Sequence, residues 1–130
     1  MKQRIPPIRF LPAIVWFLIL CFLFFLPGEE VPTIGWMERL HLDKVVHFGL
    51  FVILIVLAFW PVVKSENTKA FKLKWLFALA ILAIAYGIIT EFIQHYFIPG
   101  RSFDIWDWVA DSCGVMAAIY IVRRFLKAYF

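Results

Sequence analysis

Long apolar runs alternate with short polar segments along the whole chain. Residues 10–27 contain no charged side chain, residues 45–63 are apolar apart from His47, and residues 75–90 carry no charge. About 20 apolar residues in a helix span the hydrocarbon core of a bilayer. The pattern predicts an all-α fold, a four-helix transmembrane bundle in a single domain over residues 1–130, with spans at about 10–27, 43–63, 75–97 and 105–122.

The first apolar run raises the question of a signal peptide. The apolar region of a signal peptide covers about 7–15 residues and ends in a cleavage site of small residues. Here the run continues for longer and ends in Leu-Pro-Gly-Glu-Glu. We therefore interpret residues 10–27 as a retained membrane span.

Charged residues are divided unevenly between the segments that connect the spans. Residues 1–9, 64–74 and 123–130 together hold ten of the thirteen Lys and Arg residues but one of the nine acids. Because cytoplasmic loops are enriched in Lys and Arg, this bias predicts that both termini are cytoplasmic. These cations flank apolar runs and form no continuous basic stripe, so we expect no nucleic-acid partner despite the net charge of +4.

Composition supports a membrane protein and excludes a disulfide scaffold. Hydrophobic residues make up 64% of the chain, whereas soluble domains have about 45–50%. Cys21 and Cys113 stand alone in apolar surroundings, so no disulfide or thiolate metal site is predicted and both are expected to be buried small hydrophobic residues.

Polar residues interrupt the predicted spans at one depth, in the half of the membrane opposite the termini. They occur at the start of the second span, the end of the third, the following loop and the start of the fourth. Ionisable residues inside spans are costly and commonly mark functional sites. Asp43 and His47 lie on one helix face, as do Glu91 and Gln94. The candidate ligand-binding residues are Asp43, Lys44, His47, Glu91, Gln94, Arg101, Asp107 and Asp111.

Two interpretations of this cluster use its cations. Lys44 and Arg101 could bind an anion, helped by the amino-terminal ends of the second and fourth spans, which carry unpaired N–H groups and a positive dipole end. Alternatively, the same two cations could pair with the surrounding acids and hold three helix ends together, because buried ionic groups can specify an arrangement.

A third interpretation is a divalent metal site. Glu91 and His95 lie four residues apart on one helix face, and His47, Asp107 and Asp111 could complete a set of oxygen and nitrogen ligands. Such a metal could activate water for hydrolysis. No complete ligand motif is present, so we predict neither a metal nor a cofactor.

Several motifs in this order resemble the VanZ-like family of small bacterial membrane proteins, over roughly residues 10–122. They are Asp43-Lys44-x-x-His47-Phe48, Glu91-x-x-Gln94, Pro99-Gly100-Arg101, Asp107 and Gly114. The resemblance implies a multi-pass helical protein of the bacterial plasma membrane. It also implies a link to the cell envelope, because the founding member is associated with low-level resistance to glycopeptides of the teicoplanin type.

The chain departs from the family pattern at two positions. Asp111 stands where the pattern has Asn, which adds a potential charge, and Ala118 stands where it has a second Gly, which could relax the closest helix approach. The resemblance supplies no reaction, because most members have no assigned activity.

Together these features lead to one main functional hypothesis. We expect an envelope membrane protein whose polar site binds the anionic headgroup of a membrane lipid or of a lipid-linked cell-wall precursor, with Lys44 and Arg101 as contacts. The alternatives are a membrane hydrolase or transferase that uses Glu91 or His47 as general base, and a non-catalytic assembly subunit. The sequence leaves open whether the protein is an enzyme and whether it forms homo-oligomers.

Overall fold

The computed structural model describes residues 4–27 and 42–129, which are entirely helical apart from their connections. The helices are η1 (Pro7–Phe10), α1 (Leu11–Phe24), α3 (Leu42–Val63), α4 (Lys69–Phe97), α5 (Ile105–Phe125) and η3 (Lys127–Tyr129). In this part of the chain, four helical segments are long and apolar enough to cross a membrane, the first of them Pro7–Phe24. The predicted four-helix all-α fold of a multi-pass membrane protein is thereby confirmed.

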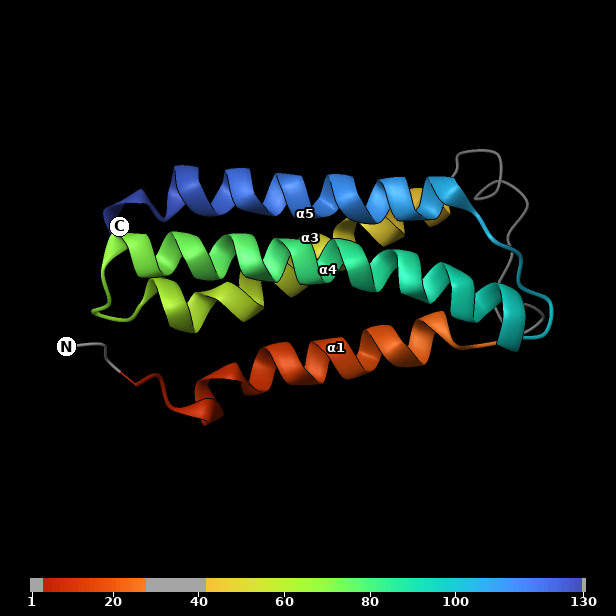
Figure 1. Ribbon diagram of the computed structural model, residues 1–130, viewed down its shortest axis with the longest axis horizontal. Helices are drawn as coiled ribbons and strands as arrows, with labels where there is room; N and C mark the ends of the chain where they lie inside the picture. Colours follow the sequence, from red (N-terminus) through yellow and green to blue (C-terminus); the bar gives the residue numbers. More distant parts are fainter. Residues whose placement is uncertain (1–3, 28–41, 130) are drawn as a thin grey trace.

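The four long helices run alongside one another (Figure 1). The start of α1, the end of α5 and the α3–α4 connection lie at one end of the bundle, and the α4–α5 loop lies at the other (Figure 1). We call the first end, formed by residues 4–10, 64–74 and 123–129, the basic end. The end formed by residues 42–47 and 91–111 is the acidic end. The assignment of the basic end to the cytoplasm stays a prediction.

Helix α4 begins several residues before the predicted span, for a local reason. The hydroxyl of Thr68 accepts a hydrogen bond from the N–H of Phe71 and caps the helix start. Hydropathy marks where the membrane begins, whereas such a cap marks where the helix begins. At its other end α4 stops at Phe97, and Gly100 then turns the chain with a φ of 72°, a conformation that glycine adopts at no steric cost.

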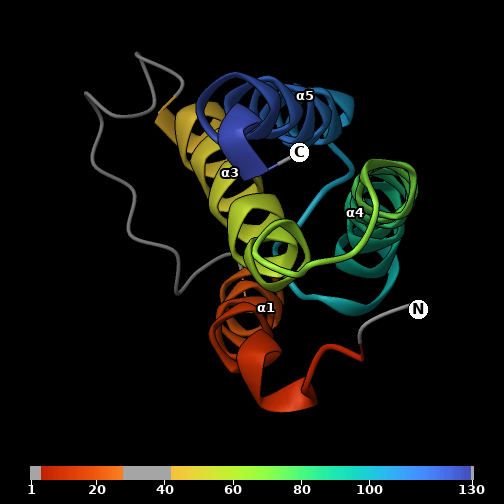
Figure 2. The same cartoon turned by 90° about the vertical axis from the view of Figure 1, so that its left-hand side faces the viewer.

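Helix α3 occupies the middle of the bundle. It packs against α1, α4 and α5, and the view along the bundle shows α1 and α5 on opposite sides of it (Figure 2). Phe51, Ile55 and Phe59 of α3 are almost fully buried, as are Val115 and Val122 of α5. The core therefore follows the α3–α5 contact.

A glycine permits the closest approach between α3 and α5. A Cβ placed on Gly114 would collide with the backbone carbonyl of Phe48 and lie 3.2 Å from its Cα. Small residues are common where membrane helices pack closely. At this position only a glycine lets the backbones of α3 and α5 approach this far.

Many large apolar side chains point outward along the length of the helices. Phe22, Ile81, Leu82 and Met116 are each at least 60% exposed. In a membrane these surfaces face lipid chains. Cys113 belongs to this outward surface, so its expected burial is wrong.

Candidate functional site at the acidic end

The first turns of α3, the last turns of α4 and the start of α5 place their polar side chains at the acidic end. Asp104 is the N-cap of α5, where its side chain accepts a hydrogen bond from the N–H of Trp106 at 2.8 Å. Asp43 and Asp107 lie in the first turns of α3 and α5. Acidic residues suit these positions because helix amino termini carry a partial positive charge.

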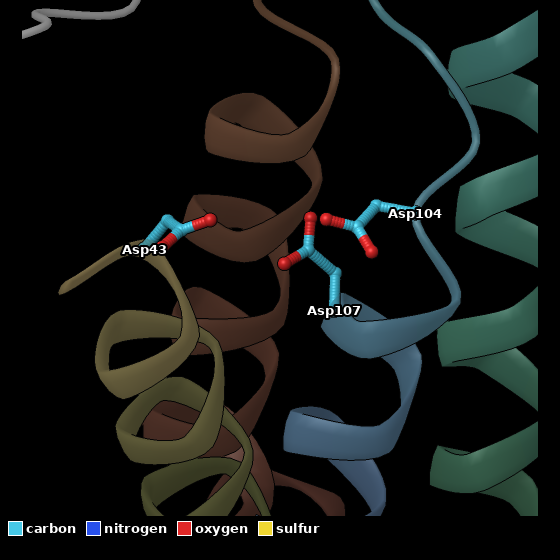
Figure 3. A group of neighbouring side chains, drawn as sticks. All are labelled: Asp43, Asp104 and Asp107. Carbon is cyan, nitrogen blue, oxygen red and sulfur yellow. The ribbon is translucent and has the colours of Figure 1, made fainter. Parts of the chain in front are cut away.

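Lys44 lies between three aspartates from two helices. Its Nζ is 2.9 Å from Asp43, 2.5 Å from Asp104 and 2.6 Å from Asp107. Figure 3 shows the Asp104 and Asp107 carboxylates close together, with Asp43 extending toward them from α3. These three carboxylates are close enough to share a metal ion, but the ammonium group already bonds to all three. A cation entering there would have to displace it.

Asp104 lies just outside the spans and responds to this ammonium. The hydrogen bond from Lys44 is the main reason that the pKa of the Asp104 carboxyl falls below its ordinary value, with the N–H of Trp106 adding to the effect. Asp104 is absent from the predicted set of site residues. Its position immediately before Ile-Trp-Asp at a helix start is a capping signal that could have identified it.

His47 lies between two carboxylates of α5. Its Nδ1 is 2.9 Å from Oδ1 of Asp111, and its Nε2 is 3.8 Å from Oδ2 of Asp107. Phe24 of α1 stacks on the imidazole, with ring centroids 4.8 Å apart. A carboxylate on Nδ1 fixes the orientation of the ring. The pair is held firmly, because His47 is 8% exposed and Asp111 only 1%.

Two polar residues of α4 join this helix to its neighbours. Glu91 accepts a hydrogen bond from the backbone N–H of Asp104 at 2.9 Å, and Gln94 donates to the carbonyl of Phe24 at 2.8 Å. Both side chains are buried. Glu91 thus holds the start of α5, and Gln94 satisfies a carbonyl at the end of α1 that has no partner within its helix.

The metal site that would combine Glu91 with His95 does not form. Glu91 is 1% exposed, whereas His95 is on the exposed surface and packs edge-on against Tyr96. Four residues along a helix correspond to about one turn plus 40° of rotation, and here that rotation carries the two side chains into different environments.

Arg101 is placed differently from Lys44. It is half-buried in the α4–α5 loop, and its Nε donates to the carbonyl of Leu26 at 3.3 Å. Within residues 4–27 and 42–129 it makes no ion pair. Among the described residues, the hypothesis that both cations pair with the acids is met for Lys44, whereas Arg101 is directed toward the end of α1.

The eight predicted site residues thus divide into two groups. One network contains Asp43, Lys44, His47, Asp107 and Asp111, and Glu91 reaches it through the backbone of Asp104. Gln94 and Arg101 instead contact the end of α1. The start of α3, the end of α4 and the start of α5 all lie at the acidic end, so their polar residues share one depth, as the sequence predicts.

Comparison with known proteins gives one result that covers nearly the whole chain. A protein-family model described as VanZ/LLP1 matches residues 9–127. No curated protein and no solved structure matches. The matched region contains all eight predicted site residues and nearly all of the four membrane-spanning segments. The resemblance seen in the motifs is thereby confirmed, and the chain belongs to the VanZ/LLP1 family.

Proposed function

We propose that the acidic end binds the anionic headgroup of an envelope lipid or of a lipid-linked cell-wall precursor in the bacterial plasma membrane. One observation carries this proposal. Unlike Lys44, Arg101 has no carboxylate partner among the described residues, and its guanidinium bonds to the carbonyl of Leu26. If the ligand is a cell-wall precursor, a contribution to glycopeptide tolerance would follow from its sequestration.

The chemistry of Arg101 suits a phosphate. A guanidinium carries five N–H donors in a planar fork that matches phosphate oxygens in pairs. One of these donors bonds to the Leu26 carbonyl and orients the group, and the others have no partner among residues 4–27 and 42–129. Arg101 is also at the end of the spans, which is the depth of lipid headgroups.

Lys44 has a different role in this proposal. Its three aspartates neutralise its charge, so an incoming phosphate would have to compete with them for the ammonium. We assign Lys44 to holding α3 against α5. Arg101 faces the end of α1, whereas the aspartates lie around Lys44, so the two cations have different neighbours among the described residues.

Thermal unfolding in detergent micelles tests the proposal. A ligand at 100 times its Kd stabilises the folded state by about 2.7 kcal/mol. We expect polyprenyl phosphate or phosphatidylglycerol to raise the Tm of the wild type but not of Arg101→Ala, with Arg101→Lys intermediate. Arg124→Ala, at the exposed basic end, is the matched control. An equal rise in a well-folded Arg101→Ala protein would contradict the headgroup site.

A second candidate function is hydrolysis or group transfer on such a lipid, with His47 as general base. The specific observation in its favour is the carboxylate of Asp111 on Nδ1, because a base oriented through Nδ1 can take a proton from water at Nε2. Glu91 is less suited to this role, since its carboxylate already accepts the N–H of Asp104 and it is 1% exposed, against 8% for His47.

Turnover assays separate this candidate from simple binding. Phosphate release from polyprenyl diphosphate should disappear in His47→Gln and persist in His95→Gln, a matched change on the exposed face of α4. Phosphate release that His47→Gln leaves unchanged would refute the role of His47. If neither lipid binding nor turnover is found, the remaining candidate is a non-catalytic assembly subunit.

A further inference from the structure

A cavity separates α1 from α4 on one side of α3. Its volume is about 300 Å³, and its walls come from Phe10 of η1, residues 13–17 of α1, 54–58 of α3 and 79–86 of α4. Figure 2 shows α1 and α4 beside α3 at different angles around it. This groove is distinct from the acidic end, because it begins at Phe10, next to the basic end, and reaches Tyr86 near the middle of α4.

Short side chains create the groove. Ala13, Ala58 and Ala83 line it on the three helices, whereas Phe17 and Leu82 form its larger walls. The lining contains no charged residue and lies within the candidate spans. Water needs two to four polar partners in such a space, which the groove does not provide. Its natural content is a hydrocarbon chain.

Charge at the mouth of the groove indicates what the chain is attached to. Arg9 immediately precedes Phe10, which lines the groove, and Arg9 is exposed. The lining begins at Phe10, at the basic end, and reaches Tyr86 near the middle of α4, so the groove runs from the basic end toward mid-membrane. This is the direction of an acyl chain of the leaflet at that end.

We propose that this groove binds one acyl chain of an anionic phospholipid from the leaflet at the basic end, with the lipid headgroup beside Arg9. The charge at that end supports an anionic headgroup, because residues 4–10, 64–74 and 123–129 contain nine Lys and Arg residues and a single acid, Glu66. The site differs from the proposed headgroup site in its depth and its leaflet.

Native mass spectrometry tests the proposal directly. The protein is reconstituted in vesicles of equal phosphatidylglycerol and phosphatidylcholine with identical acyl chains, then extracted and weighed with its retained lipid. The wild type should retain phosphatidylglycerol selectively. Removal of Arg9 should weaken retention about fivefold, because a Lys or Arg near an anionic surface contributes about 1 kcal/mol. The test variant is therefore Arg9→Gln, and Arg124→Gln is its control.

A second pair of variants tests the groove itself. Ala58→Leu adds three carbons inside the groove and should abolish retention, whereas Ala78→Leu adds them on the exposed face of α4 and should not. Retention of lipid by Ala58→Leu, or equal retention of both phospholipids by the wild type, would overturn the proposal. A wild-type dimer that Ala58→Leu separates would also overturn it, because the groove would then hold a second copy.

Failure here can be told apart from failure of the headgroup proposal. A lipid that is lost in Arg101→Ala but kept in Ala58→Leu belongs to the acidic end. A lipid with the opposite behaviour belongs to the groove.

Discussion

Replacement of Lys44 by methionine tests the network at the acidic end most directly. Methionine keeps most of the aliphatic length of lysine but removes its charge. In Lys44→Met the carboxylates of Asp43, Asp104 and Asp107, now lying close together, lose the ammonium that bonds to all three. We therefore expect loss of three charge-assisted hydrogen bonds together with repulsion between carboxylates.

The size of the effect follows from the exposure of each partner. The side chain of Asp107 is 15% exposed and that of Lys44 is 23% exposed, so this pair should contribute the 1.5–3 kcal/mol typical of hydrogen bonds to charged groups, or about 2 kcal/mol. Asp104 and Asp43 are 37% and 55% exposed, and each such pair contributes about 0–1 kcal/mol. The expected loss in the free energy of unfolding is about 3 kcal/mol.

Denaturant titration in mixed micelles measures this free energy. Arg124→Met, at an exposed position of the basic end, controls for the loss of a cation. Adding Asp107→Asn to Lys44→Met should recover part of the loss, because it removes the least exposed of the unpaired charges. If Lys44→Met changed stability by less than about 0.5 kcal/mol, solvent would be screening the network and the assigned role of Lys44 would be refuted.

Two further predictions concern the contacts of α5. Gly114→Ala should lower the free energy of unfolding by about 1–3 kcal/mol, because its Cβ would meet the backbone of Phe48. Gly49→Ala is the control and should not lower it, because a Cβ there has nothing within 4 Å. Equal effects of the two variants in the same denaturant titration would contradict the close approach of α3 and α5. Because Lys44 lowers the pKa of Asp104, the extra stability of the wild type over Asp104→Asn should be present above pH 3.8 and disappear as the pH falls through the lower folded pKa. Asparagine retains a capping oxygen, so unfolding at several pH values isolates the charge; a difference independent of pH would refute this linkage.

The metal and anion interpretations illustrate what sequence spacing leaves open. Spacing places Glu91 and His95 near one helix face, but it does not say how far α4 is rotated about its axis. Packing against α3 and α5 sets that rotation, with Glu91 inside and His95 outside. Likewise, the two cations Lys44 and Arg101 look equivalent in the sequence, yet one meets three aspartates and the other a backbone carbonyl.

The sequence by itself determined the four apolar helices, the common depth of their polar turns and the family to which the chain belongs. These properties depend on runs of neighbouring residues. The length of an apolar run decides whether a helix spans the membrane, and the number of spans decides which polar turns lie at the same end of the bundle. The close packing at Gly114 was also within reach, since small residues mark helix contacts.

Only the tertiary structure decided which polar groups meet and where the groove between α1 and α4 lies. Asp104 joins Lys44 across 60 residues of chain, and Asp111 reaches His47 across 64. Such pairs depend on which helices become neighbours and how each is rotated. Side chains of both helices fix this jointly when they pack, so no single segment of the sequence contains it.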